Sequence, residues 1–312
     1  MVEWGVNGNE QLGAGFRDGR EAAPRAVLGA TGVRQLTAGF KFALAVLSNC
    51  TVESWGSNAK AQLGDGHRAQ AQNRPAPVVN LAGVKEVAAG NAHAIALLYN
   101  GTVWTWGASE FGERGNGESN FERTERVEAP SLARPRDEPV QVPGLEDVVQ
   151  VAAGGTADYA LLADGEVLAW GGNEYGRLGI EAGAEEEELC YGETHAIVPV
   201  QCSTTPRQVK LGGEPLGGVE RIAAGGESAY AIRGGGEEVL AWGAGLYGEL
   251  GNGSTKASTS AVPVIFEPPS PVVEVAAGEH YALARLAEGS AWAWGSDEAG
   301  QLGIAAAGVA QR

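Results

Sequence analysis

The residue types that most often do chemistry are sparse in this sequence and form no catalytic pattern. The four histidines stand at positions 67, 93, 195 and 280, without the H-E-x-x-H spacing of a zinc site. No G-x-S-x-G nucleophile elbow is present, and no two acidic residues form a pair that the sequence identifies as catalytic. The sequence therefore predicts a non-enzymatic protein with no catalytic residue, no metal and no cofactor.

Two cysteines and one histidine lie together in an unusual segment. Cys190 and Cys202 could close a disulfide, or they could be two free thiols in a reducing compartment. A metal site formed with His195 is a third and weaker interpretation. Cys50 stands in "SNCTVESWG" where a related segment, "YNGTVWTWG", has glycine, so we expect a free thiol in a turn.

The segment "GAGLYG" at 243–248 matches the dinucleotide-binding pattern G-x-G-x-x-G. That interpretation requires a helix next, whose N-terminus would hold a pyrophosphate. The chain continues instead with "ELGNGS", and "GGNEYG" occupies the corresponding place at 171–176. We therefore interpret these glycines as turn residues.

The composition limits the class of partner. The net charge is -17 and the pI about 4.7, which opposes binding to nucleic acid or to an anionic membrane surface. No stretch approaches the ~20 apolar residues of a membrane span, and the N-terminal "MVEWGVNGNEQLG" lacks the features of a signal peptide. A solvated acidic exterior that keeps the protein soluble is the simplest interpretation of the charge.

Three short motifs recur along the chain, and the elements that contain them must position any functional residue. A Leu-Gly pair lies seven to nine positions after the Trp of each Trp-Gly pair. The exception follows Trp106, where Arg114 replaces the leucine and predicts an altered loop. Ala-Ala-Gly recurs at 88–90, 152–154, 223–225 and 276–278, with Thr-Ala-Gly at 37–39. The Trp-Gly pairs stand at 4–5, 55–56, 106–107, 170–171, 242–243 and 294–295.

Within one unit these motifs lie on short strands. "VKEVAAG" (84–90) and "HAIALL" (93–98) are apolar, and the Asn-Gly at 100–101 is a hairpin turn that leads into "TVWTWG". "RPAPVV" (74–79) reads as a further edge strand. About four strands per ~50 residues, without helical periodicity, predict an all-β fold, a β-propeller. We expect the Ala-Ala-Gly motifs near its axis and each Trp ring between adjacent blades.

The segments "VESWGSNAKAQLGDG" and "VAAGNAHAIALLYNGTV" resemble the repeat of the regulator-of-chromosome-condensation family, whose members form seven-bladed propellers. The likeness covers nearly the whole chain. The family often has His three places after the Ala-Ala-Gly motif, and here only His93 fits; we interpret it as structural. Six Trp-Gly halves but five Ala-Ala-Gly halves give about six blades' worth, five full units plus a half unit. We therefore predict one domain over 1–312 that is an open arc or a fragment of a seven-bladed propeller.

Two long insertions and three aromatic residues are the candidate binding features. The insertions cover about 118–138 and 181–215, and both should emerge from one face of the disc. An acidic loop without a partner is the alternative. Five positions after the Trp, three loops carry aromatic residues, and with Arg114 they form the predicted partner-binding set: Phe111, Tyr175 and Tyr247. Rings packed beneath their own loops are the alternative here.

The predicted function is a non-enzymatic scaffold, expected to be monomeric, that binds a protein partner through loops on one face. The family resemblance implies two narrower alternatives, guanine-nucleotide exchange on a small GTPase and inhibition of a β-lactamase by a secreted binder. A propeller enzyme with a site in the central channel is a further alternative. The Ala- and Gly-rich composition and the candidate disulfide favour a bacterial protein at the cell surface or secreted.

Overall fold

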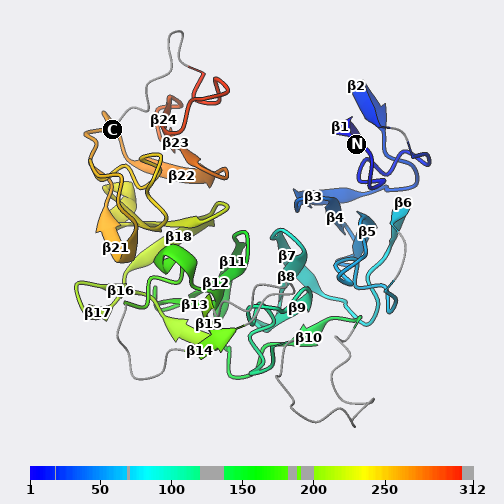
Figure 1. Ribbon diagram of the computed structural model, residues 1–312, viewed down its shortest axis with the longest axis horizontal. Helices are drawn as coiled ribbons and strands as arrows, with labels where there is room; N and C mark the ends of the chain where they lie inside the picture. The colour runs from blue at the N-terminus through cyan, green and yellow to red at the C-terminus, as the bar shows by residue number, and fades with distance from the viewer. Residues whose placement is uncertain (18, 69–70, 120–136, 182–187, 191–199, 304–312) are drawn as a thin grey trace.

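The regular structure of the protein is almost entirely β. The computed structural model describes residues 1–17, 19–68, 71–119, 137–181, 188–190 and 200–303. In this part of the chain the strands form an open arc of radially arranged sheets (Figure 1). The helical elements described are two 3-10 turns, η1 (Glu174–Gly176) and η2 (Gly234–Gly236), and no described helix is long and apolar enough to span a bilayer.

Four complete sheets follow one another, and the first strand of each lies on the inside of the arc. The first sheet consists of β3 (Val33–Ala38), β4 (Phe42–Leu47), β5 (Val52–Gly56) and β6 (Gln72–Pro77). The second consists of β7 (Val84–Ala89), β8 (His93–Leu98), β9 (Val103–Gly107) and β10 (Val140–Gln141). The third consists of β11 (Val148–Ala153), β12 (Ala157–Leu162), β13 (Val167–Gly172), β15 (Val200–Gln208) and β14 (Glu188–Cys190). A hairpin of β16 (Lys210–Leu211) and β17 (Glu214–Pro215) precedes the fourth sheet, β18 (Val219–Ala224), β19 (Ser228–Arg233), β20 (Glu238–Gly243) and β21 (Ser258–Pro263).

Within the described residues, the sheets at the two ends of the arc have fewer than four strands. At the N-terminal end, β1 (Val2–Val6) and β2 (Arg20–Ala26) form a two-stranded sheet equivalent to the outer half of a blade. At the C-terminal end, β22 (Val272–Ala277), β23 (Tyr281–Leu286) and β24 (Ala291–Gly295) form a three-stranded sheet. These two sheets lie on either side of the opening in Figure 1. The predicted β-propeller is confirmed, in the form of an open arc.

Small residues allow the inner strands to crowd together. A Cβ atom on Gly90 would lie 2.5 Å from the carbonyl oxygen of Gly154 in the next sheet, and one on Gly154 would lie 2.9 Å from that of Gly225. Real Cβ atoms do not approach this closely, so only glycine fits. The expectation that the Ala-Ala-Gly motifs lie near the axis is therefore correct.

From Trp55 onward, the Trp of each Trp-Gly pair packs against the Leu-Gly loop of the preceding sheet. A Cβ on Gly64 would lie 2.8 Å from Trp106 Cδ1, and one on Gly115 would lie 2.7 Å from Trp170 Nε1. Both indoles are fully buried, and Trp106 Nε1 donates to the carbonyl oxygen of Gln62 at 3.0 Å. Burying a ring of this size stabilises the joint by several kcal/mol, at ~25 cal/mol per Å².

Side chains near the axis also connect successive inner strands. Gln35 donates Nε2 to the carbonyl oxygen of Val87 at 2.9 Å, and its Oε1 accepts the N–H of Val87 at 3.0 Å. Gln150 makes the same two bonds, also at 2.9 and 3.0 Å, with the inner strand of the sheet that follows it. At the joint between these two, Glu86 accepts the N–H of Val151 at 3.0 Å. These inter-sheet bonds hold the inner strands at a fixed spacing.

Candidate functional site

A cavity of about 680 Å³ opens at one end of the central channel, on the face that carries the Trp-Gly to Leu-Gly loops. We call it the mouth cavity. Backbone turns that follow the inner strands form part of its wall, and the loops form the rest. Its lining includes Phe40, Lys41, Lys60, Asn91, Phe111, Thr156, Glu174, Arg177, Glu227 and Glu279. The wall of the channel below it consists of the inner strands, with their alanines and glycines.

The charges around the mouth cavity are mixed and mostly paired. Lys60 Nζ lies 2.6 Å from Glu110 Oε1 in the neighbouring loop. Arg177 donates Nη1 to Thr156 Oγ1 at 2.9 Å, and its Nη2 lies 3.7 Å from Glu227 Oε1 in the next sheet. The cavity therefore offers polar and charged groups held by neighbouring blades, which suits a surface that recognises another protein.

Two side-chain bonds hold most of the loops in one shape. In the first, an Asn, Ser or Asp three residues after the Trp accepts the N–H of the Leu-Gly leucine or its equivalent; the acceptors are Asn7, Asn58, Ser109, Asn173 and Asp297. In the second, the Gln or Glu before that leucine accepts the backbone N–H two residues earlier; these acceptors are Gln11, Gln62, Glu113, Glu249 and Gln301. The loops are thus ordered before any partner arrives.

The loop of residues 173–179 departs from this pattern, because Arg177 stands where the other loops have Gln or Glu. A guanidinium only donates, so it cannot accept the N–H of Tyr175. Arg177 Nε instead donates to the carbonyl oxygen of Glu174 at 2.9 Å. Tyr175 adopts a left-handed backbone (φ 59°), and its side chain is 51% exposed. A non-glycine residue in this conformation is strained, which is common where a backbone serves recognition.

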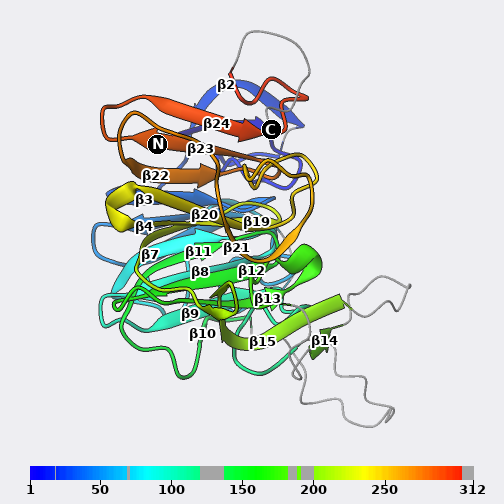
Figure 2. The same cartoon turned by 90° about the vertical axis from the view of Figure 1, so that its left-hand side faces the viewer.

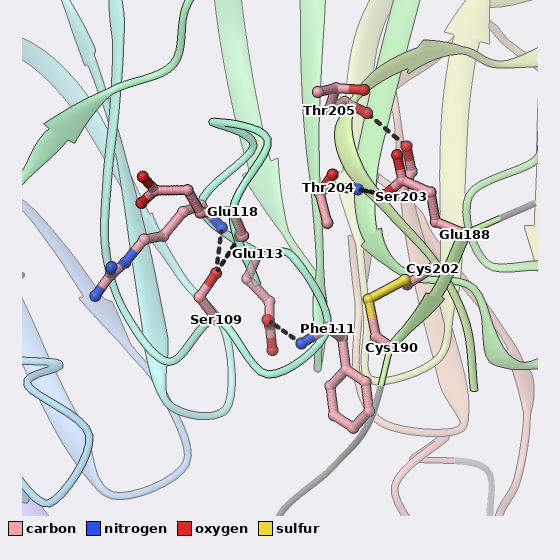
Figure 3. The surroundings of a disulfide bond; sticks show 11 residues. Ser109, Phe111, Glu113, Glu118, Glu188, Cys190, Cys202, Ser203, Thr204 and Thr205 are labelled. Carbon is pink, nitrogen blue, oxygen red and sulfur yellow. Dashed lines mark hydrogen bonds between the residues drawn. A yellow bond between two sulfur atoms is a disulfide. The ribbon is translucent and has the colours of Figure 1, made fainter. Parts of the chain in front are cut away.

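The other predicted residues lie in different surroundings. Phe111 is half-buried and lines the mouth cavity, beside the disulfide-linked strands of the next sheet (Figure 3). Tyr247 is half-buried against His280, with ring centroids 4.5 Å apart. Arg114 is only 3% exposed and occupies the place of the buried leucines; it donates Nη2 to the carbonyl oxygen of Gly107 at 3.3 Å. Burial lowers the pKa of Arg114. The structure thus brings Phe111 to the cavity and leaves Tyr175 the most exposed of the three rings.

A buried charged group lies between the second and third sheets, below the mouth cavity. His93 Nε2 is 3.1 Å from Asp158 Oδ1, and the two residues are 1% and 0% exposed. Burial opposes the charge of His93, but the carboxylates of Asp158, Glu113 and Glu110 outweigh it and raise the pKa of His93. Burial raises the pKa of the Glu113 carboxyl to about 7. The pair is sealed from solvent and connects the two sheets.

Cys190 and Cys202 form a disulfide in the structure, between β14 and β15 (Figure 3). Part of the second insertion, about 181–215, is therefore regular: β15 is the fourth strand of its sheet, and β14 extends that sheet by one strand. His195 and most of the first insertion lie outside the described residues. Cys50 is a free, partly exposed thiol in its turn.

Sequence reasoning missed Arg177, Lys60 and Lys41 as site residues. The signal for Arg177 was present, because an arginine stands where most of the Leu-Gly motifs have glutamine or glutamate before the leucine. The two lysines had no such signal, because their place at the cavity depends on how the sheets are arranged around the axis.

Comparison with known proteins gives one family and several distant relatives. The family model of the RCC1-like domain matches residues 1–310. The ubiquitin-protein ligase HERC2 of Mus musculus is 28% identical over 308 residues, which are 96% of this chain and 6% of that protein. The ultraviolet-B receptor UVR8 of Arabidopsis thaliana is 28% identical over 307 residues, 97% of this chain and 62% of the receptor. The chain thus spans less than two thirds of either relative.

Solved structures share the fold. Human WBSCR16 superposes with a TM-score of 0.74 at 23% identity, covering 97% of this chain and 72% of that one. Prp20p from Saccharomyces cerevisiae, studied for its binding to Gsp1p and histones, superposes with a TM-score of 0.60 at 19% identity, covering 98% and 82%.

Proposed function

The chain belongs to the family of RCC1-like domains, and on this premise we propose that it is a non-enzymatic scaffold that binds a protein partner around the mouth cavity. The observation that carries the proposal is the loop of residues 173–179. It presents an exposed tyrosine on a strained backbone, between Glu174 and Arg177, and these two residues line the cavity together with groups from several blades.

The physical case rests on order and exposure. Most of the loops are held by side-chain to backbone bonds, so little conformational freedom is lost when a partner binds. Tyr175 and Phe111 offer aromatic surface, which dominates interface hot spots. Tyr247 contributes its outer edge, and Arg114, buried in its loop, supports the shape of the surface rather than contacting the partner.

Site-specific photo-cross-linking of the intact protein tests the proposal. A photoreactive amino acid at position 175 should capture a discrete partner, whereas one at Tyr99 should not, because Tyr99 is even more exposed but lies in a turn on the opposite face. Tyr175→Ala should weaken binding of the captured partner roughly tenfold or more. Equal capture at both positions would contradict the proposal.

A second variant isolates the backbone effect. Arg177→Gln restores the acceptor that the other loops have, so the N–H of Tyr175 is capped and its ring should move to a half-buried position like that of Phe111 and Tyr247. Partner binding should then fall although Tyr175 is still present. Unchanged binding would show that the strained backbone is not part of recognition.

The same experiment separates the narrower functions. A small GTPase among the captured proteins, with faster nucleotide release in the presence of this chain, would support exchange activity. Capture of a β-lactamase, with loss of its activity, would support the inhibitor function.

The Cys190–Cys202 disulfide supports a place in an oxidising compartment, which fits a secreted or cell-surface protein. Fractionation of the producing cells tests this part of the proposal. Accumulation of the protein in the cytoplasm with reduced cysteines would overturn it.

A further inference from the structure

The same hydrogen bond joins the inner strands of successive sheets at three places along the arc. At each of these joints, the side chain of the third residue of one inner strand accepts the N–H of the fourth residue of the next inner strand. The acceptors are Gln35, Glu86 and Gln150, and they lie 3.0 Å from the backbone nitrogens of Val87, Val151 and Ile222, respectively.

The joint between β18 and β22 departs from this pattern, because Arg221 is the third residue of β18. A guanidinium only donates, so it cannot accept the N–H of Val275. Val275 pairs with Ala284 in the same register as Val87 with Ala96, so its N–H points out of its hairpin in the same direction. Within the described residues, no side chain accepts this N–H, and the side chain of Arg221 has no hydrogen-bond or ion-pair partner.

A cavity of about 320 Å³ lies at this joint, where β18 and β22 run side by side (Figure 1). We call it the joint cavity. Arg221 and Val275 line it, together with Arg285 and Glu274, which form an ion pair at 3.0 Å. The charged groups on the described lining are thus two guanidinium groups and one carboxylate. One positive charge is left unbalanced, beside a backbone donor that has no acceptor.

From this arrangement we propose that the joint cavity binds the carboxylate of a small organic acid, in the place that a side-chain acceptor takes at the other three joints. One carboxylate oxygen accepts the N–H of Val275, and the other accepts a hydrogen bond from the guanidinium of Arg221. Such charge-assisted bonds are stronger than neutral ones. The volume lies at the lower end of the ~300–1,000 Å³ range of ligand sites, so the acid is a short one.

The joint between β7 and β11 shows that a carboxylate suits this position. There Glu86 Oε1 accepts the N–H of Val151 at 3.0 Å, and the positive charge of the adjacent Lys85 stabilises the ionised form of Glu86. At the joint cavity the cation belongs to the chain and the carboxylate comes from the ligand. A phosphate would bring about two negative charges, more than the single positive charge available.

The joint cavity is separate from the mouth cavity, and the two share no lining residue. Arg221 stands near the beginning of β18, whereas Gly226 and Glu227, which line the mouth cavity, follow the end of that strand. A carboxylate bound between β18 and β22 adds a bridge between two sheets. Because it binds only the folded chain, the acid should also raise the unfolding temperature.

Calorimetric titration and amide NMR of the intact protein with sodium propionate test the proposal. The expected result is saturable binding, with a saturable downfield shift of the Val275 amide proton, because a charged acceptor deshields that proton. Propionamide has the same shape without the charge and should bind roughly tenfold more weakly or worse. Sodium chloride at the same ionic strength should produce no saturable shift.

A substitution that copies the other joints locates the site. Arg221→Gln introduces the residue found at Gln35 and Gln150, so it supplies an acceptor for Val275 and removes the cation. Propionate binding should fall roughly tenfold or more, and the Val275 amide proton should lie downfield before any ligand is added. Arg20→Gln, at an exposed arginine of β2, should leave binding unchanged.

Three results would overturn the proposal. They are the absence of saturable propionate binding, an equal response to chloride, and binding that Arg221→Gln leaves unchanged.

Discussion

The first and second complete sheets are successive copies of one unit, yet they meet their following neighbours in different ways. The first presents Phe42 to the alanines of β8, and this joint is apolar. The second presents His93 to Asp158, with Glu113 buried nearby. The Leu-Gly loops show the same contrast, because the first sheet has the apolar Leu63 where the second has the charged Arg114. The comparison teaches that the repeat frame accepts buried charge where the next blade supplies an opposite charge.

This tolerance has an energetic consequence. Both groups of a buried ion pair lose their hydration, and their mutual attraction roughly offsets this loss. The pair therefore contributes little net stability compared with apolar packing. Removing one partner alone, however, leaves an uncompensated charge. Converting the second joint into a copy of the first, one residue at a time and then together, therefore measures what the charged group contributes.

The largest effect is expected from Asp158→Ala. It leaves His93 buried without its carboxylate and should lower the free energy of unfolding by about 3 kcal/mol. The double variant His93→Phe with Asp158→Ala reproduces the pair of Phe42 and Ala94 and should recover most of that loss. Urea unfolding followed by tryptophan fluorescence measures both. A single variant as stable as the original chain would show that the pair is not coupled.

The pH dependence of the free energy of unfolding should also distinguish the two joints between sheets. Because burial raises the pKa of Glu113 from 4.5 to about 7, the folded state holds a proton that the unfolded state releases first. The stability is fully present below pH 4.5 and falls as the pH rises to 7, by on the order of 3 kcal/mol in total. The raised pKa of His93 acts in the same direction.

Glu113→Gln should reduce this slope by the part that Glu113 contributes, whereas the part from Glu3, whose pKa burial also raises to about 7, should stay. The glutamine can keep the bond to the N–H of Phe111, because Gln62 makes the same bond in the preceding loop at 2.8 Å. Unfolding midpoints measured between pH 4 and 8 check the result. An unchanged slope in the variant would assign the dependence to other groups.

A smaller gain is expected from Arg114→Leu, which copies Leu63. The substitution removes a desolvated guanidinium and fills the same buried place with an apolar side chain, so the protein should become more stable by about 1 kcal/mol. Thermal unfolding measures the change. A loss of stability instead would show that the bond to the carbonyl oxygen of Gly107 is essential to this loop.

The smallest effect concerns the hairpin turns of the same two sheets. Cys50 has a left-handed backbone (φ 64°), and its counterpart Gly101 (φ 81°) adopts that region without strain. Cys50→Gly should stabilise the protein by about 0.5–1 kcal/mol, and Gly101→Ala should destabilise it by a similar amount. Calorimetry of the two variants side by side checks the pair. Effects of the same sign would contradict the argument.

The fold followed from the sequence because its determinants are local and repeated. The Trp-Gly and Ala-Ala-Gly motifs fixed the strands, and their unequal numbers predicted the arc. The His93–Asp158 pair was not predicted, because its members are 65 positions apart and meet only when two sheets are packed. Strand β15 was assigned to an insertion, because "VQCSTTPRQ" contains proline and few apolar residues.

The candidate site was only partly accessible to sequence reasoning. The aromatic positions were visible by their spacing from the Trp, and their role in binding stays a prediction. That Tyr175 is the exposed one depends on a hydrogen bond that Arg177 cannot accept, which is a property of loop geometry.

The bonds between inner strands determine how the arc would respond to a pulling force. Gln35 and Gln150 each form two hydrogen bonds with the next inner strand, one as donor and one as acceptor. Glu86 forms one, as the acceptor for the N–H of Val151. Lys85 adds a second bond at that joint, because its Nζ donates to the carbonyl oxygen of Val149 at 2.8 Å, so at least two side-chain bonds resist tension at each of these three joints. Figure 2 shows the strands of successive sheets stacked one above another, so a force on one inner strand is passed to the next through these bonds.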